Sequence, residues 1–163
     1  MPVTIVVTAF KSVASIFGGL LLADFVSGII HWFEDRYGNP NWPVLGHTIR
    51  ANQEHHFRPR AFLKGSFLSR NREVLVIGAL FLIAFWATDT LNLFTGSAVL
   101  FGAFSNEFHR AAHRSPKENG KLITALQKTG LAQSFQHHAA HHRLGKDTHY
   151  CVITNISISP IKK

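Results

Sequence analysis

Histidine is the residue type in this sequence with the greatest capacity for chemistry. The chain has 11 histidines among 163 residues, and four of them stand between His137 and His142. If this segment is helical, His138, His141 and His142 follow i, i+3, i+4 spacing and lie on one face. Four imidazoles in six residues would be costly to bury unsatisfied and costly as a charged surface, so we interpret the segment as metal-ligating rather than as a solvated basic stretch.

Other positions supply further imidazoles. His109 and His113 stand at i and i+4 and would share one face of a helix. This spacing is common by chance and gains weight only from the other clusters. His55 and His56 form an adjacent pair, and His31 follows a long apolar segment. These histidines extend the candidate ligand set.

Two carboxylates flank His31 on the same predicted helix. Asp24, Gly28, His31 and Asp35 follow a spacing of i, i+4, i+7 and i+11 and form one stripe. Ligating imidazoles usually donate their second ring N–H to a carboxylate or a carbonyl, so Asp24 and Asp35 are candidates for orienting a ligand. Asp24 could instead cap or hydrogen-bond within a helix bundle, but an acid inside a membrane span is costly, which favours a functional role.

The number and type of these side chains indicate which metal they would bind. Eight or more imidazoles exceed the coordination of one ion, since zinc takes about four ligands and octahedral iron about six. The single cysteine, Cys151, excludes an internal disulfide and a thiolate zinc cage. A nitrogen-rich site with open positions therefore favours two irons and oxygen chemistry. Such a cofactor can remove hydrogen from an unactivated methylene, which amino-acid side chains cannot.

The net charge of +8 is distributed in a way that is typical of a membrane protein. Of 17 Lys and Arg residues, seven stand between Glu34 and Glu73 and nine follow Asn106. These residues form neither a run nor a basic patch interleaved with aromatic residues, so nucleic acid is not expected as a partner. An excess of positive charge marks the cytoplasmic side, so we expect both polar regions, with the histidines, on that side.

The elements that must position the histidines are predicted to be membrane helices. The apolar stretch Ser12–His31 has about 20 residues, enough to span the bilayer. Val74–Phe104 is interrupted by polar residues in its middle and is typical of a helical hairpin whose arms are each short for a full span. The polar connector Glu34–Arg72 between them is predicted to form a short helix at Ile49–Phe57.

The remaining third of the chain is predicted to lie beside these helices. Ser115–Gly120 is typical of a turn, and Leu122–His142 is predicted to form one amphipathic helix that could lie in the membrane interface. The short tail from Tyr150 has no assignment. The expected fold is all-α: a single domain over residues 1–163, built as a multi-pass membrane helical bundle with a histidine-rich metal centre on the cytoplasmic side.

The sequence resembles the lipid desaturase domain (Kua) family, which includes plasmanylethanolamine desaturase and a plastid enzyme that desaturates an acyl chain of phosphatidylglycerol. The resemblance runs from about Asp24 to Asn155 with its motifs in the same order. The matching segments are Asp24–Gly28, His31–Asp35, Arg50 with Gln53–His56 and Pro59, Phe104–His113, Leu126–Gln127, His137–Arg143 and Tyr150–Asn155.

The resemblance implies a di-iron lipid desaturase that introduces a C=C bond into an alkyl or acyl chain of a membrane phospholipid. It implies dioxygen as co-substrate, an external electron donor resembling cytochrome b5 or ferredoxin, and a bacterial inner membrane or an organelle membrane. The implied ligands are His31, His55, His56, His109, His113, His138, His141 and His142. Asp35 matches an acidic position of the first motif, and His137 belongs to the last histidine motif as a residue behind the ligands.

Two alternatives remain open on the sequence alone. A lipid hydroxylase on the same scaffold would begin with the same hydrogen abstraction, and a non-catalytic membrane metal-binding protein or haem protein would use histidines without desaturation. His47 and His149 stand outside the family pattern and are not counted as ligands. Family members commonly continue with another apolar segment, so we expect either a short form or a truncated C-terminus at Lys163.

Overall fold

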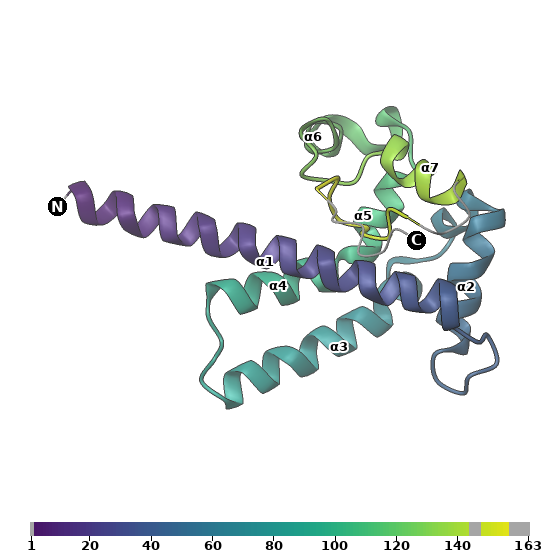
Figure 1. Cartoon of the computed structure of the whole chain (residues 1–163), viewed down its shortest axis with the longest axis horizontal. Coiled ribbons are helices and arrows are strands. Elements are labelled where there is room, and N and C mark those ends of the chain that lie inside the picture. Colours follow the sequence, from purple (N-terminus) through teal and green to yellow (C-terminus); the bar gives the residue numbers. More distant parts are fainter. Residues whose placement is uncertain (1, 144–147, 157–163) are drawn as a thin grey trace.

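The structure is a computed structural model that describes residues 2–143 and 148–156; within these residues it contains helices and no strand. The expected all-α class is confirmed for this part of the chain, and the end at Lys163 lies outside it. Figure 1 shows α4 lying along α1 and α3 lying beyond α4, with the other elements gathered around the C-terminal half of α1. The helices are α1 (Pro2–Tyr37), α2 (Gly46–Phe57), the 3-10 helix η1 (Pro59–Leu63), α3 (Phe67–Ala87), α4 (Leu93–Ala103), α5 (Ser105–Ala112), α6 (Pro116–Thr129) and α7 (Phe135–Arg143).

Helix α1 is longer than the predicted span, with 36 residues. Among the described residues it is the one helix both long enough and apolar enough to cross a membrane, while α4 is apolar but has only 11 residues. Length and hydropathy thus identify one candidate span where the sequence predicts several. The first half of α1 extends beyond the other elements (Figure 1), and its large apolar side chains, such as Val3 and Phe10, are exposed.

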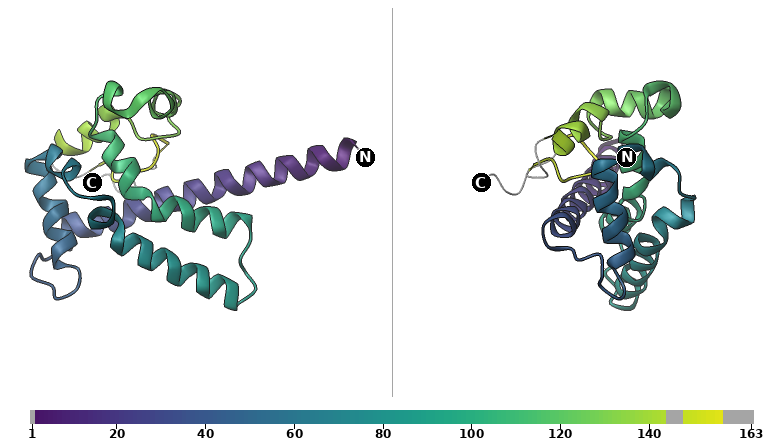
Figure 2. Two further views of the ribbon diagram at one scale, coloured as in Figure 1. Left: turned by 180° about the vertical axis from the view of Figure 1, so that it is seen from behind. Right: turned by 90° about the vertical axis from the view of Figure 1, so that its right-hand side faces the viewer.

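Helices α3 and α4 form the predicted hairpin, with α3 beginning at Phe67. The turn falls in the predicted polar break, where the side chain of Asn92 accepts the backbone N–H groups of Phe94 and Thr95 and caps α4. Helix α4 packs closely on α1. A Cβ at Gly19 of α1 would lie only 2.7 Å from the carbonyl oxygen of Phe94 in α4, so the close approach requires glycine there. Figure 2 shows the hairpin lying along one side of α1.

The polar connector contains α2 and η1, and α2 includes the predicted helix. Ile49 of α2 is 1% exposed, and Asn52 donates a hydrogen bond to Asp35 of α1. These contacts hold α2 against the C-terminal end of α1. His55 and His56, one turn further along α2, therefore lie close to His31.

The prediction of one helix over Leu122–His142 is wrong, because the structure has α6 and α7 there. Gly130 has φ +79°, a left-handed conformation that ends α6. The predicted turn at Ser115–Gly120 is also wrong over most of its length, since Ser115 caps α6 and the helix begins at the next residue. Gly120, with φ +73°, kinks the helix. The break at Gly130 lets α7 take its own direction, with its histidines toward α5.

The tail from Tyr150, which the sequence leaves unassigned, is part of the core. Val152 and Ile153 cluster with Leu20 and Ala23 of α1. The backbone N–H groups of Ile153 and Thr154 donate to the carboxylate of Asp24, at 2.9 and 3.2 Å. The tail thus packs against α1, the helix that carries His31.

Candidate metal centre

Four histidines from three helices bring their ring nitrogens together in what we call the first group, which consists of His55, His109, His113 and His138. The Nε2 atom of His138 lies 2.9 Å from that of His109 and 3.0 Å from that of His113, and the latter two are 3.2 Å apart. All four side chains are buried, and their ligand atoms lie within 4.8 Å of one another. Helices α2, α5 and α7 therefore converge on one point.

A second group lies beside the first and consists of His31, Asp35, His56 and His141. The Oδ2 atom of Asp35 lies 3.1 Å from Nε2 of His56, 3.3 Å from Nε2 of His141 and 3.5 Å from Nε2 of His31. The Asp35 side chain is 1% exposed. Asp35 is therefore a member of a candidate ligand set, although the sequence predicts it behind the ligands.

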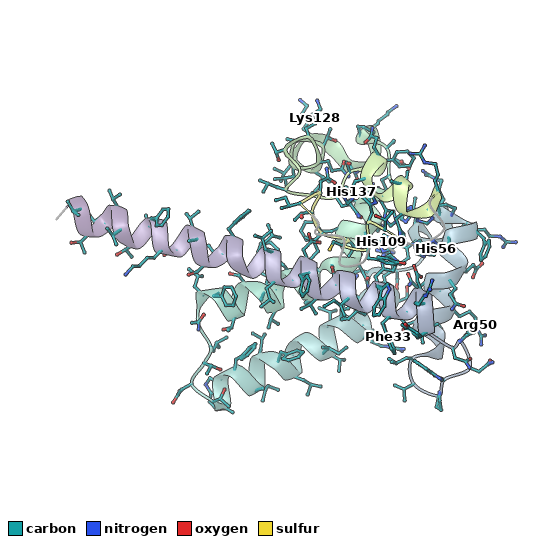
Figure 3. The ribbon with its side chains drawn as sticks, in the orientation of Figure 1. Phe33, Arg50, His56, His109, Lys128 and His137 are labelled. Atoms are coloured by element: carbon teal, nitrogen blue, oxygen red, sulfur yellow. The ribbon has the colours of Figure 1, made fainter. Side chains whose placement is uncertain are left out.

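His142 lies between the two groups. Its Nε2 atom is 2.9 Å from Nε2 of His138 in the first group. Its ring centroid is 4.6 Å from that of His56 in the second group. The eight histidines predicted as ligands are thus all brought together, and Figure 3 shows His56 and His109 close to each other where α2 and α5 meet.

Backbone carbonyl groups orient several of these rings through the nitrogen that faces away from the centre. Nδ1 of His31 lies 3.1 Å from the carbonyl oxygen of Tyr150, and Nδ1 of His141 lies 2.8 Å from that of Thr148. Nδ1 of His55 contacts the carbonyl oxygen of Asn52. A carbonyl only accepts, so each ring carries its proton on Nδ1 and leaves the Nε2 lone pair available.

Burial keeps the imidazoles neutral. Burial first, and then the nearby His142, lower the pKa of His113 to about 3. Burial likewise holds the pKa values of His55, His109 and His138 well below the usual range. The pKa of His142 falls to about 4 for the same reason. These rings are therefore in the neutral form that binds metal ions.

The spacing and burial of these nitrogen and oxygen atoms suit binding to a shared metal ion better than hydrogen bonding to one another. Nε2 of His31, Nε2 of His55, Nε2 of His141 and Oδ2 of Asp35 are buried without a hydrogen-bond partner, an arrangement that is costly unless a ligand compensates. Two nitrogens bound at a right angle to one ion at about 2.1 Å are about 3.0 Å apart. The spacings of 2.9 to 3.2 Å in the first group match this value.

Two residues predicted to lie behind the ligands have other immediate partners. Asp24 holds the tail rather than a histidine, with Oδ2 accepting the Thr154 hydroxyl at 2.5 Å. The same tail carries the Tyr150 carbonyl that lies at Nδ1 of His31. His137 belongs to neither group, and its ring centroid lies 4.6 Å from that of His149; it is labelled in Figure 3.

Sequence reasoning missed three features of the site. The carbonyls of Thr148 and Tyr150 carry no side-chain pattern, although Tyr150 belongs to a segment of the family resemblance. Phe62 of η1 lies against the first group, with its ring centroid 4.7 Å from that of His109 and 5.8 Å from that of His55. In the sequence, the one indication of this contact is that Phe62 is an aromatic residue within a polar connector.

The chain is similar in sequence to known proteins. A family model described as the lipid desaturase domain matches residues 20–163. The chain is 31% identical over 141 residues to fatty acid desaturase 4, chloroplastic, of Arabidopsis thaliana, covering 85% of this chain and 44% of the relative. It is 30% identical over 152 residues to plasmanylethanolamine desaturase of Myxococcus xanthus, covering 88% and 53%. It is 28% identical over 155 residues to plasmanylethanolamine desaturase 1 of Mus musculus, covering 87% and 57%.

No solved structure matches the chain. The chain spans about half the length of these three relatives. The family model covers most of the chain, including every histidine of both groups and the tail that orients two of them. The chain therefore belongs to the lipid desaturase domain family.

Proposed function

We propose that this chain is a membrane lipid desaturase whose two groups of side chains hold two irons. The observation that carries the proposal is the pair of adjoining buried groups, seven imidazoles and one carboxylate, with His142 between them. When bound, the irons would supply the oxidising power, with dioxygen as co-substrate, that amino-acid side chains lack. The reaction takes two hydrogens from adjacent methylene carbons and, with two further electrons and two protons, reduces dioxygen to two waters.

The chain itself would hold the ligands in position and exclude water. The carbonyls of Thr148 and Tyr150 orient His141 and His31 through Nδ1, which limits ring rotation when an ion is taken up. Phe62 covers one side of the first group with an apolar ring. Because the imidazoles are neutral and the two groups contain a single carboxylate, the centre with its irons bound would carry net positive charge. This charge favours reduction of the centre.

We further propose a multi-pass membrane topology in which α1 crosses the bilayer and the α3–α4 hairpin enters it from the same side. Exposed apolar side chains along the hairpin, among them Leu80, Ile83 and Trp86, are costly in water and suited to lipid. The histidines would lie on the cytoplasmic side, in keeping with the basic residues of the connector and of the last third of the chain.

The proposed substrate is a membrane phospholipid that carries an alkyl or acyl chain. Both kinds of substrate occur in the names of relatives, which are fatty acid desaturases and plasmanylethanolamine desaturases. An apolar cavity of about 350 Å³ lies against α5, which carries His109 and ends just before His113, and is lined mainly by Leu100, Phe101, Phe104, Phe108 and Ile123. Such a cavity suits part of a hydrocarbon chain. An external protein resembling cytochrome b5 or ferredoxin would supply the electrons.

Lipid mass spectrometry together with metal analysis tests this proposal. The chain is expressed in cells without plasmalogens or an equivalent desaturase, and the purified protein is analysed for iron. We expect new vinyl-ether or newly unsaturated phospholipids and about two irons per chain. His113→Ala, from the first group, and His141→Ala, from the second, should each lose iron and at least a hundredfold of the activity.

The matched control is His47→Ala, because His47 is exposed and belongs to neither group. It should retain both iron and activity. Desaturation that persists in a variant with an empty group would contradict the proposal. Hydroxylated lipids in place of unsaturated ones would assign the chain to the hydroxylases, and protein without iron would exclude the di-iron mechanism.

A further inference from the structure

A second cavity lies beside the first group. It has a volume of about 520 Å³, and His113 is one of its lining residues. Its wall combines apolar surface from Phe135 with the cationic side chains of Arg114 and Lys128. A cavity of this size is large enough for a small ligand rather than a solvent molecule.

The cationic side chains that line this cavity differ in whether they form an ion pair. Arg60, which also lines it, forms an ion pair with Glu118 at 2.7 Å. Arg114 and Lys128 form no ion pair with any carboxylate in the described part of the chain. The cavity therefore carries net positive charge, and an anion entering it could pair with Arg114 or Lys128 without breaking an existing ion pair.

The surface beyond the cavity is also basic. A shallower hollow of about 470 Å³ on the outer face of α6 shares Lys128 and Thr124 with it and is lined further by Lys117 and Lys121. Figure 3 shows Lys128 on the outer side of α6. An anionic ligand would thus be attracted from solution or from a membrane surface before it reaches Arg114.

We propose that the cavity beside His113 binds the phosphate group of the lipid substrate through Arg114 and Lys128. This inference rests on the proposed desaturase function and deepens it. A phospholipid has the two properties that the cavity combines, an anionic phosphate and an adjoining apolar chain. Because His113 of the first group is also part of the cavity wall, a phosphate held there would keep the first carbons of the attached chain close to that group.

The shape of the site favours a lipid over an acidic electron-donor protein. A protein partner buries about 800 Å² of a broad surface on each side, whereas Arg114 is partly buried within a hollow that also contains apolar Phe135. A phosphate on a flexible chain can reach into such a hollow. The carboxylates of a folded protein reach it less readily.

Binding of short-chain lipids to the purified protein tests the proposal without relying on turnover. The probes are dihexanoyl phosphatidylethanolamine and dihexanoylglycerol, which share their acyl chains and differ by the phosphate head group, titrated by calorimetry in a neutral detergent. Wild type should bind the phospholipid at least tenfold more tightly. Arg114→Ala and Lys128→Ala should each weaken phospholipid binding by about tenfold and leave dihexanoylglycerol binding unchanged.

The matched control is Lys64→Ala, which removes the same charge at an exposed position that lines neither the cavity nor the hollow on α6. It should bind both lipids as wild type does. Equal affinity of wild type for the two lipids would overturn the proposal, as would inorganic phosphate that binds as tightly as the phospholipid. Unchanged lipid affinity in both variants, with slowed turnover restored by more electron donor, would assign the cavity to the donor protein.

The same measurements separate this inference from the proposed function. Phospholipid binding that depends on Arg114, in a wild-type protein that produces no unsaturated lipid, would support the phosphate site while contradicting the desaturase. Bound iron and desaturation, together with lipid binding that does not depend on the phosphate, would support the desaturase and contradict the phosphate site.

Discussion

Adjacent residues on one helix belong to different groups in this centre. His55 joins the first group, whereas His56, about 100° further around α2, joins the second. His138 and His141 of α7 are divided in the same way. Each of these helices lies between the two groups and contributes to both. A substitution at one position should therefore affect mainly one metal.

Asp35 tests this division at the level of one side chain. Asp35→Asn keeps the size of the residue but replaces one carboxylate oxygen with a nitrogen donor and removes the charge. We expect the second group to bind metal at least tenfold more weakly, while the first group retains its metal. Iron content per chain should fall from about two toward about one, measured by elemental analysis after dialysis.

The control for this variant is Asp89→Asn, in the exposed turn between α3 and α4. It should keep the full iron content. Equal loss of iron from both groups in the Asp35 variant would mean that the groups are not separable. Unchanged iron would mean that Asp35 does not bind metal.

The sequence predicted which histidines gather but not how they divide. Spacing showed that His138 and His141 could share a face, yet the direction of α7 relative to α1 decides that only His141 reaches Asp35. That direction depends on the break at Gly130, where a single helix was predicted. Sequence spacing likewise could not decide whether Asp35 binds a metal or orients a ligand. A carboxylate one helical turn after His31 can lie behind that histidine or beside it.

At the scale of elements, the helical hairpin followed from its apolar pattern and polar break, whereas the tail could not be predicted. Its place depends on hydrogen bonds to Asp24, 129 residues away along the chain from Ile153. Such a contact has no local pattern. Gly28 allows the tail to approach α1 closely. A Cβ at this position would lie 2.7 Å from Sγ of Cys151 and 3.2 Å from its backbone nitrogen.

Gly28→Ala should therefore disturb the site through the tail. Part of the tail backbone must move away from α1, which shifts the Tyr150 carbonyl that orients His31. We expect a loss of about 1 to 3 kcal/mol in stability, the usual cost of overpacking, and at least a tenfold loss of activity. Thermal unfolding and desaturation assays measure the two effects.

Gly102→Ala in α4 is the matched control, because a Cβ there has no atom within 4 Å. It should be neutral or slightly stabilising in a helix. A Gly28 variant with wild-type stability and activity would show that the tail does not have to approach α1 closely.

On the scale of the whole molecule, the buried imidazoles make folding sensitive to acid. A histidine in the unfolded chain takes up a proton below about pH 6.5. In the folded protein burial lowers the pKa of His113 to about 3 and that of His142 to about 4. Between these limits the unfolded state binds more protons than the folded state, so stability falls as the pH falls. Each histidine that stays neutral contributes a slope of about 1.4 kcal/mol per pH unit in that range.

The metal-free protein should therefore melt at a lower temperature at pH 5 than at pH 7.5, measured in detergent after treatment with a chelator. His113→Ala removes one such group and should make the decline shallower, even if its melting temperature at pH 7.5 is also lower. His47→Ala, at an exposed position, should leave the decline unchanged. A melting temperature that is constant between pH 7.5 and pH 5 in wild type would mean that these imidazoles are hydrated and titrate normally. In that case the folded chain would not keep them neutral for metal binding.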